Sequence, residues 1–312
     1  MLMVWEFSPC EGKSKYDEMV YYPINRTTRP FVGSWGATAL SAFIAEFGDK
    51  VNEQPVELEL TEGIAVVTMS APQRRNALST AMRTMLRDQL MSLSEDDSVH
   101  AIVLTGASGH FSSGGDVSEM APPGQPTDPV VGRRRLEILH AIVRILNGGP
   151  KPVVAAVEGF AFGAGMSFAV ACDWVIAAEN ARFAAAFGKI GLIGDCGLLW
   201  TLPQRIGLPR AKDLLLTART VDAAEALAGG LVDAVVPAGQ ARAAAVQKAM
   251  QYRGVAPRAL AATKSTLARC PASFDELLQM EADVQLPLSL SSDHEEARRA
   301  FLEKRPPVFT GR

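Results

Sequence analysis

The sequence is poor in the residues that metal sites and disulfide frameworks require. It contains only four histidines (His100, His110, His140, His294) and four cysteines (Cys10, Cys172, Cys196, Cys270). Neither set has the close spacing of a zinc site or of a small disulfide-bonded domain. The cysteines are therefore expected to be unpaired thiols in a reducing compartment, and we expect no metal.

Two other features are missing: an excess of basic charge and a long apolar run. The net charge of −3 provides no basic field for nucleic acid or an anionic membrane. No stretch approaches the roughly 20 apolar residues of a spanning helix, and Glu6, Glu11 and Lys13 interrupt the start of any secretory signal. With 48% hydrophobic and 21% charged residues, the chain is expected to be a globular cytoplasmic protein.

The first 54 residues differ in composition from the rest. Nine of the 21 aromatic residues lie within the first 50 positions, which is too many for a plain disordered tail. Residues 38–47 could form a short amphipathic helix. This extension could dock on the rest of the protein or on a neighbouring subunit. Alternatively, the start codon lies further along, so that the working protein begins near Met19 or later. The sequence leaves these two alternatives open.

From residue 55 the pattern alternates between strands and helices. An alternating stretch (56–60), a turn (61–63) and an apolar run (64–69) predict a β-hairpin. Further strands are predicted at 101–105, 153–157, 174–177 and 183–187, with helices at 78–93, capped by Ser79, and at 130–146. The loop 121–129 is rich in proline and glycine and is expected to be mobile. Beyond Leu198 the chain is expected to be almost wholly helical, which gives an α/β core (55–250) and a helical C-terminal region (251–312).

Two glycine-containing stretches could supply backbone donors. Residues 111–117 (FSSGGDV) leave a strand, and residues 157–173 (VEGFAFGAGMSFAVACD) join a strand to a buried helix. Each can present a backbone N–H that no side chain blocks, so together they could stabilise an oxyanion. Tight turns alone would also explain the glycines.

Five ordered motifs give the chain from about residue 55 to 312 a family resemblance. They are RRNAL (74–78), FSSGGDV, VEGFAFGAGMSFAVACD, KIGLIGDCG (189–197) and the closing AFLEKRPPVFTGR. Together they resemble the enoyl-CoA hydratase/isomerase (crotonase) superfamily. The resemblance implies a crotonase (ClpP/crotonase-like) spiral of ββα units with a helical C-terminal trimerisation region, a homotrimer or a dimer of trimers, and an acyl-CoA thioester substrate without a further cofactor.

The same resemblance assigns residues by position. The N–H groups of Gly115 and Ala164 would bind the thioester oxygen. The remaining positions would contact coenzyme A or the acyl group: Arg74, Asn76, Ala77, Ser113, Asp116, Val117, Phe187, Ile190, Gly194 and Lys304.

The reaction depends on the acid and base groups, which vary within the superfamily. Hydratases carry glutamates where this chain has Ser167 and Phe187, and neither can act as a general base. Asp195 is the remaining carboxylate and resembles the aspartate of phenylacetate-pathway-type enoyl-CoA isomerases. One carboxylate suits a double-bond shift, although Asp195 could also merely cap the helix that begins near Gly197.

His140 supports a different reaction. Its position resembles that of the catalytic histidine of 4-chlorobenzoyl-CoA dehalogenase, whose nucleophilic aspartate matches Asp195. An aryl-CoA dehalogenase or CoA-ester hydrolase is therefore an alternative, with Asp195 as nucleophile and His140 as base. Two further alternatives are a hydratase-like lyase and an acyl-CoA-binding or scaffold protein without turnover, because Gly194 and Leu198 depart from the usual residues around the aspartate. The sequence predicts an enoyl-CoA isomerase.

Overall fold

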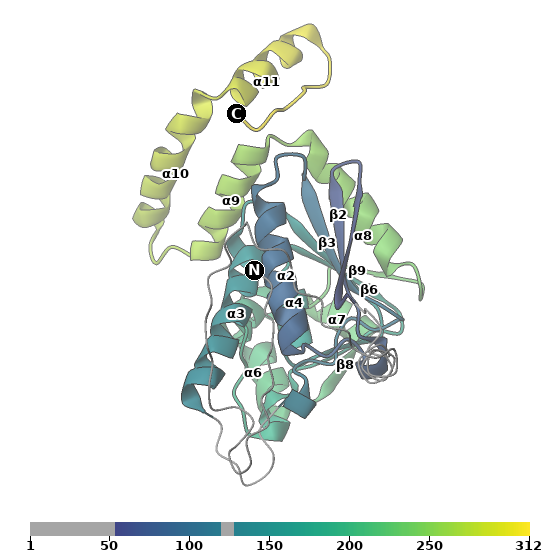
Figure 1. Ribbon diagram of the computed structural model, residues 1–312. Coiled ribbons are helices and arrows are strands. Elements are labelled where there is room, and N and C mark those ends of the chain that lie inside the picture. Colours follow the sequence, from purple (N-terminus) through teal and green to yellow (C-terminus); the bar gives the residue numbers. More distant parts are fainter. Residues whose placement is uncertain (1–53, 120–127) are drawn as a thin grey trace, which may run out of the picture. The chain divides into compact units, whose positions relative to one another are not determined.

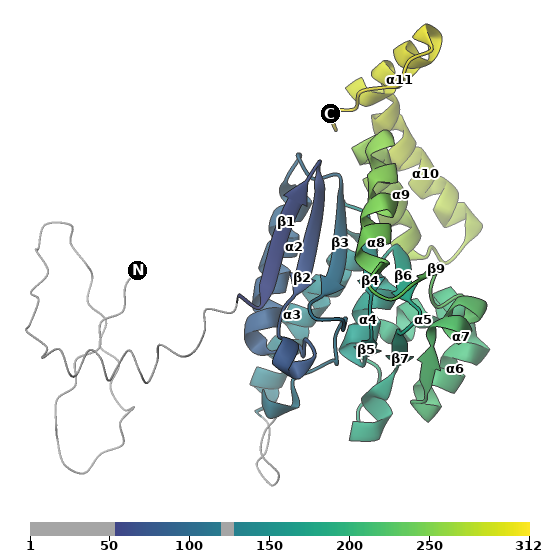
Figure 2. The same cartoon turned by 90° about the vertical axis from the view of Figure 1, so that its right-hand side faces the viewer.

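The computed structural model describes residues 54–119 and 128–312. The extension 1–53, including the helix expected at 38–47, and most of the loop expected at 121–129 lie outside the described residues. Figure 1 shows the arrangement of the described elements, and Figure 2 shows them from the side.

A six-stranded sheet forms the centre of this part of the chain. Its order is β1-β2-β3-β4-β6-β9, and only the β1–β2 pair is antiparallel. The strands are β1 (Val56–Thr61), β2 (Ile64–Met69), β3 (Ala101–Gly106), β4 (Val153–Val157), β6 (Trp174–Ala178) and β9 (Ala234–Val236). The predicted hairpin is confirmed: β1 and β2 pair across Glu62 and Gly63, both with positive φ (51° and 77°), as a two-residue hairpin turn requires.

A second, three-stranded sheet has the order β5-β7-β8. It consists of β5 (Phe160–Phe162), β7 (Arg182–Ala184) and β8 (Thr220–Asp222). β5 follows β4 after a turn at Gly159, so the glycine-containing stretch leaves the large sheet and enters the small one. This step carries the chain toward the segment that follows β3.

Helices cover both faces of the large sheet, and the strands are accordingly apolar on both sides. One face of β2, including Ile64 and Val66, packs on α8 (Ala241–Met250) through Ala241, Ala245 and Ala249. The other face packs on α2 (Thr80–Glu95), α3 (Pro129–Gly148), α4 (Ala164–Ala171) and α5 (Leu198–Ile206). Ser79 caps α2 as predicted, since its Oγ accepts a hydrogen bond from the amide nitrogen of Met82 at 3.2 Å.

The remaining helices follow from residue 208 to the C-terminus. They are α6 (Leu208–Thr217), α7 (Ala223–Gly229), α9 (Pro257–Arg269), α10 (Phe274–Ser289) and α11 (Ser292–Glu303). Short 3₁₀ turns complete the structure: η1 (Pro72–Arg74), η2 (Val117–Glu119), η3 (Ala186–Ile190) and η4 (Gln251–Gly254). None of the helices that the structure describes is long and apolar enough to cross a membrane.

The structure corrects three details of the predicted local structure. The strand predicted at 183–187 ends at Ala184, and Phe187 lies on η3. The region beyond Leu198 is mainly helical as predicted, but two three-residue strands, β8 and β9, interrupt it, and each pairs with a strand far away in the sequence. The apolar spacing of residues 130–146 predicts one buried face of α3 with Leu136, Leu139, His140, Val143 and Leu146; Leu139, Val143 and Leu146 are buried together with Ile142, whereas Leu136 and His140 are exposed.

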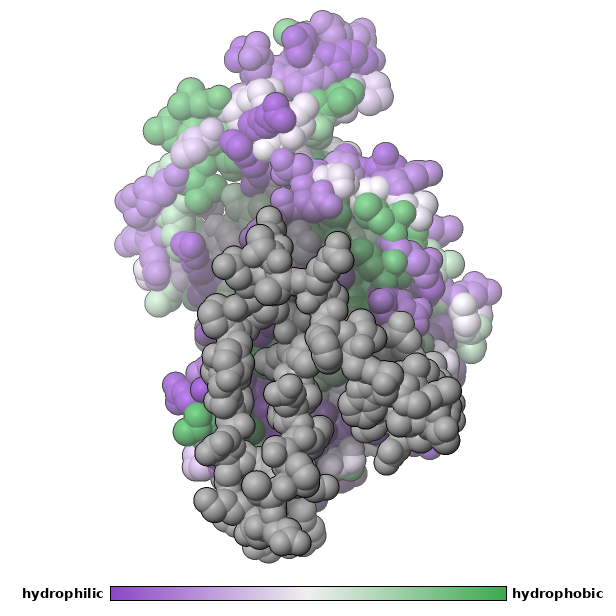
Figure 3. Space-filling view, viewed as in Figure 1, coloured by the Kyte–Doolittle hydropathy of each residue, from purple (hydrophilic) through white to green (hydrophobic). Residues whose placement is uncertain are grey.

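The C-terminal helices are attached to the core by a buried ion pair. Lys264 on α9 is 6% exposed, and its Nζ lies 2.6 Å from Asp173 Oδ2 and 2.8 Å from the Lys151 carbonyl oxygen. Asp173 Oδ2 also accepts the amide of Val153 at the start of β4. α10 differs, because none of its residues is buried and Phe274, Leu278 and Leu286 are exposed. Figure 3 shows apolar side chains gathered on this helix.

Candidate active site

The structure brings the two glycine-containing stretches together. Ser112 donates from its amide to the Phe160 carbonyl at 2.8 Å, and the Phe162 amide donates to the Ser112 carbonyl at 3.0 Å. A methyl group added at Gly114 (φ 95°) would lie 2.8 Å from the Phe162 carbonyl oxygen and 3.6 Å from the Ala164 amide nitrogen. The turn that precedes Gly115 therefore packs directly against the turn that precedes Ala164.

Neighbouring hydrogen bonds hold both turns in place. The Leu78 amide donates to the Gly114 carbonyl at 2.8 Å, which joins the start of α2 to the first turn. The Gly163 amide (φ 52°) donates to the Ala184 carbonyl at 2.9 Å, which joins the second turn to β7. Among the described residues, the amides of Gly115 and Ala164 donate to no acceptor. Two uncommitted N–H groups thus lie on adjacent, fixed turns, and one of them begins α4, where the helix dipole is positive.

Asp195 lies on the loop before α5, and Ser167 connects this loop to the second turn. Ser167 is fully buried, and its Oγ lies 3.1 Å from the Asp195 carbonyl oxygen and 3.2 Å from the Gly163 carbonyl oxygen. Its single proton can serve either acceptor. The Asp195 side chain does not cap α5, whose N-cap is Gly197 without a side-chain hydrogen bond. The capping alternative is therefore wrong.

The Asp195 carboxyl group is half-buried and incompletely partnered. Its Oδ1 is buried and has no hydrogen-bond partner. Burial raises the pKa of Asp195 above its ordinary value, and the Cys196 thiol and the charges of His140 and Arg83 only partly oppose this. A carboxyl group of this kind exchanges a proton nearer to neutral pH than an exposed aspartate does.

Phe187 and His140 border this region differently. Phe187 is 7% exposed, and its Cζ would lie 4.0 Å from a methyl group at Gly163, so its ring packs beside the second turn. His140 is exposed on α3, although its charge acts on Asp195. Phe187 therefore borders the second turn, whereas the link of His140 to the site is the effect of its charge on the pKa of Asp195.

Three of the positions predicted to bind coenzyme A, Arg74, Ser113 and Asp116, form one network around the first turn. Asp116 is buried, and its Oδ2 lies 2.5 Å from Nη1 of the exposed Arg74. Its Oδ1 accepts from the Ser118 amide and hydroxyl at 3.0 and 2.6 Å. Burial favours a higher pKa for Asp116, but the hydrogen bonds from Ser118 and Arg74 outweigh it and lower the pKa. Ser113 donates from its Oγ to the Arg74 carbonyl at 3.0 Å.

Asn76 and Ala77 are interior residues. The Asn76 side chain is fully buried and makes three hydrogen bonds: its Oδ1 accepts the Ala71 amide at 2.9 Å, and its Nδ2 donates to the carbonyls of Ala107 and His110 at 2.9 and 2.7 Å. Ala77 is 7% exposed. The Asn76 side chain joins its own loop between β2 and α2 to the loop that follows β3, a role that the motif alone did not reveal.

The other predicted binding positions are spread over the surface. Val117 and Ile190 are exposed, and Lys304 is exposed at the end of α11 with a positive φ of 54°. Gly194 lies between hydrophobic side chains, since a methyl group there would lie 3.2 Å from Leu215 and 3.4 Å from Leu199.

The sequence reasoning missed Arg83. This residue is 8% exposed on α2, and its charge acts on Asp195. The available signal was its position: Arg83 is the charged residue within the buried stripe of α2 formed by Met82, Leu86, Leu90 and Leu93.

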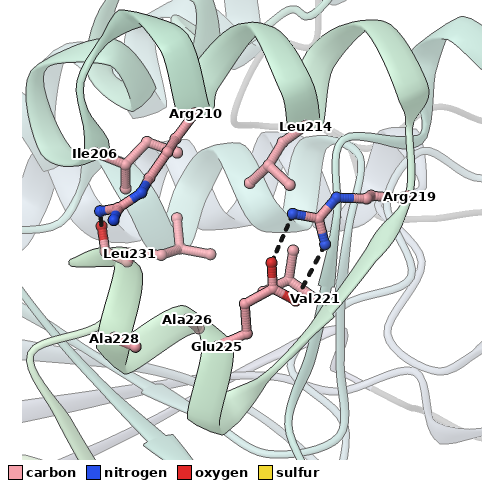
Figure 4. A pocket seen from close by; sticks show the side chains of 10 residues that line it. Ile206, Arg210, Leu214, Arg219, Val221, Glu225, Ala226, Ala228 and Leu231 are labelled. Atoms are coloured by element: carbon pink, nitrogen blue, oxygen red, sulfur yellow. Dashed lines mark hydrogen bonds and ion pairs between the residues drawn. The ribbon is translucent and has the colours of Figure 1, made fainter.

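A separate cavity of about 250 Å³ lies between α6, α7 and β8 (Figure 4). Its two arginines are already engaged: Arg219 pairs with Glu225 and Asp213, and Arg210 donates to the Gly229 carbonyl. None of the predicted site residues lines this cavity. The two turns and Asp195 therefore remain the candidate site.

Comparisons with known proteins agree with this arrangement. The family model for enoyl-CoA hydratase/isomerase matches residues 59–312. A Rhodobacter capsulatus protein named probable enoyl-CoA hydratase is 39% identical over 263 residues, covering 82% of this chain and 98% of the relative. The 1,2-epoxyphenylacetyl-CoA isomerase of Escherichia coli is 34% identical over 253 residues, covering 80% and 96%.

A solved structure shares the fold. The crystal structure of enoyl-CoA hydratase from Bacillus anthracis matches with a TM-score of 0.77 at 29% identity, covering 83% of this chain and all of that one. The architecture is therefore the crotonase fold, with its helical C-terminal region. The chain belongs to the enoyl-CoA hydratase/isomerase family.

Proposed function

We propose that this protein is an enoyl-CoA isomerase in which Asp195 moves the proton and the amides of Gly115 and Ala164 stabilise the enolate oxygen. Asp195 removes a proton from the α-carbon of a 3-enoyl-CoA, the thioester oxygen takes up the negative charge, and the same carboxyl group returns the proton to the γ-carbon. The double bond moves by one position, and neither atoms nor electrons are gained or lost. The reaction requires no metal or redox cofactor.

The observation that carries this proposal is the Asp195 carboxyl group, whose Oδ1 is buried without a partner. Since burial raises its pKa, the group accepts and returns a proton more readily at neutral pH than an ordinary aspartate. The two uncommitted amides support the electrophilic half of the reaction, because fixed donors lower the cost of the enolate charge. Losing one such donor typically costs roughly 3 kcal/mol.

Hydration of a double bond is less well supported. At the two positions where hydratases carry glutamates, Ser167 holds the Asp195 loop and Phe187 packs beside Gly163. Neither side chain can activate water as a general base. Some relatives carry the name hydratase, but the side chains here favour a reaction that uses a single carboxyl group.

A second candidate is nucleophilic attack by Asp195 on an acyl or aryl carbon, followed by hydrolysis with His140 as base. The observation in its favour is the action of the His140 charge on Asp195. Its exposure on α3 suits a residue that meets water, and the reaction would be a dehalogenation or a thioester hydrolysis.

Two substitutions separate these candidates. Asp195→Asn should abolish isomerisation of a 3-enoyl-CoA and leave the binding of a saturated acyl-CoA nearly unchanged, whereas Asp213→Asn, at an exposed carboxylate paired with Arg219, should affect neither. His140→Ala should be mild for an isomerase and severe for a hydrolytic dehalogenase. Unchanged isomerisation in the Asp195→Asn protein would refute the proposal.

We also propose that the C-terminal region assembles the protein into a homotrimer or a dimer of trimers in the cytoplasm. A 16-residue helix without a buried residue gains stability mainly from packing, and α10 exposes Phe274, Leu278 and Leu286. The double substitution Leu278→Glu and Leu286→Glu should yield monomers in light scattering coupled to size-exclusion chromatography. An equal mass for the double variant and the wild-type protein would contradict an assembly through α10.

A further inference from the structure

We infer that Ser167 is a positioning residue for the proton transfer, because its hydroxyl group fixes the main chain of Asp195 against the turn that carries the Ala164 amide. This inference rests on the proposed function, since it concerns the placement of the proposed base relative to a proposed oxyanion donor. It goes further by naming the side chain that sets this placement. It starts from one buried hydroxyl group with two main-chain acceptors.

The Ser167 hydroxyl group reaches outside its own helix. Ser167 is fully buried on α4, and its Oγ lies 3.2 Å from the Gly163 carbonyl oxygen and 3.1 Å from the Asp195 carbonyl oxygen. A hydrogen bond to the carbonyl four residues earlier is common for a helical serine, and Ser94 on α2 makes one to Leu90 at 2.7 Å. The Asp195 carbonyl instead belongs to a different segment, 28 positions further along. Helix geometry alone does not account for this second contact.

The two acceptors belong to the two halves of the candidate site. Gly163 is the N-cap of α4 and directly precedes Ala164, whose amide is a proposed oxyanion donor. The Gly163 carbonyl also accepts the Ser167 amide at 3.0 Å, so the serine is fixed to the start of the helix. One hydroxyl oxygen therefore contacts both the turn that carries a donor and the main chain of the proposed base.

The main chain at Asp195 depends on support from its surroundings. The Asp195 carbonyl accepts the Leu198 amide at 3.1 Å and closes a four-residue turn. Both central residues of this turn have positive φ, 52° at Cys196 and 73° at Gly197. Glycine adopts this conformation freely, but cysteine does so at a cost, because its Cβ crowds the backbone. Such strain persists where neighbouring groups hold it, and here the Ser167 hydroxyl group and the burial of Cys196 do so.

Ser167 acts through Asp195 and takes no part in the chemistry itself. Both of its partners are main-chain carbonyls, which cannot take up the hydroxyl proton as a general base would. The aspartate side chain is short, so its carboxyl group moves with the main chain that Ser167 holds. Misplacing a reacting group by about 1 Å can cost roughly a hundredfold in rate. The loss of one hydrogen bond should therefore slow the reaction much more than it destabilises the protein.

The substitution Ser167→Ala tests this role, because it removes the hydroxyl group and adds no bulk. The kcat for 3-hexenoyl-CoA should fall about tenfold to a hundredfold. KM and the Kd of the saturated hexanoyl-CoA should stay within about twofold of the wild-type values, since the interactions that bind the thioester are unchanged. Ser94→Ala, which removes a hydroxyl group that bonds within α2, should leave all three values unchanged.

A second variant controls for packing. Ser167→Cys keeps a side chain of similar size but offers only a weak S–H donor, so it should show the same selective loss of kcat. Thermal unfolding checks that both variants are folded.

Hydrogen exchange measures the placement without any turnover. The Leu198 amide is protected by its bond to the Asp195 carbonyl. In Ser167→Ala this amide should exchange about fivefold faster, a larger change than that of the β3 amides, which report on global unfolding. Ser94→Ala should leave the exchange of Leu198 unchanged.

The outcomes separate this inference from the proposed function. An unchanged kcat in Ser167→Ala, equal losses of kcat and of hexanoyl-CoA affinity, or wild-type exchange of Leu198 each overturns the inference. If the wild-type protein isomerises no 3-enoyl-CoA, the proposed function is refuted, and the exchange of Leu198 alone decides whether Ser167 holds the main chain of Asp195.

Discussion

The substitution Gly114→Ala tests whether the backbone of the first turn creates the site. Gly114 has a φ of 95°, which L residues with a side chain rarely adopt, and an added methyl group would lie 2.8 Å from the Phe162 carbonyl oxygen. The backbone strain costs about 1–3 kcal/mol. Overpacking against a fixed main chain costs about 1–3 kcal/mol more.

The free energy of unfolding should therefore fall by about 2–6 kcal/mol. If the protein still folds, relief of the contact must separate the turn before Gly115 from the turn before Ala164. Since an oxyanion hole depends on the positions of both donors, kcat should fall roughly 10²- to 10³-fold. Thermal or urea unfolding measures the first effect, and isomerisation of 3-hexenoyl-CoA measures the second.

Gly132→Ala provides a matched control. Gly132 lies within α3, a methyl group there would meet nothing within 4 Å, and its φ is not positive. Alanine should stabilise this helix by about 0.5–1 kcal/mol and leave turnover unchanged. Wild-type stability and turnover within twofold for Gly114→Ala would refute the argument that these two turns are rigidly packed.

Three further predictions concern side chains. Asn76→Ala removes three hydrogen bonds from a fully buried site and should destabilise the fold by about 2–4 kcal/mol in urea unfolding; a loss of acyl-CoA affinity at unchanged stability would contradict this. Asp195→Asn should be more stable than the wild-type protein at pH 7. Because burial raises the folded-state pKa of Asp195 above about 3.9, its stabilising contribution is complete below that pH and is lost as the pH rises through the folded-state value, so the difference in unfolding midpoint should vanish toward pH 3. Glu296 behaves in the opposite way: hydrogen bonds from Arg305, Arg299 and the Val308 amide lower its pKa, so its contribution is present above about pH 4.3 and is lost as the pH falls further. Residues 305–312 should therefore become accessible to proteolysis either in acid or, in the Glu296→Gln variant, at neutral pH. Equal rates of cleavage of the variant and the wild-type protein at neutral pH would count against this role of Glu296.

Long, strongly patterned elements could be predicted from the sequence because their signals are local. The hairpin 56–69 follows from alternation and a turn, and α2 follows from apolar spacing and a Ser79 cap. β8 and β9 could not be predicted, because three residues carry no periodicity and each strand exists only through its pairing with β7 or β6. His140 was misplaced for a related reason: the buried face of α3 is set by the helices against it, not by its own sequence.

The candidate site was predictable where glycine fixes the backbone and unpredictable where side chains meet. Positive φ at Gly114 and Gly163 restricts these positions to glycine, so the turns are visible in the sequence. The hydrogen bond between Ser167 and the Asp195 carbonyl joins residues 28 positions apart, and no local pattern announces it. The hydrogen bonds of Asn76, which join the loop before α2 to the loop after β3, are equally invisible before folding.

Under the proposed function, this division would allow the reaction to change without loss of the oxyanion donors. The proposed donors are main-chain groups on turns held by Leu78, Ala184 and small residues, and within residues 54–119 and 128–312 no acid or base side chain takes part in that support. The two positions where the family resemblance expects the glutamates of hydratases lie on α4 and η3, where Ser167 fixes the Asp195 loop and Phe187 fills space beside Gly163. In the proposed mechanism, replacing the glutamates leaves the electrophilic half intact and leaves the proton transfer to Asp195, on the loop that Ser167 positions.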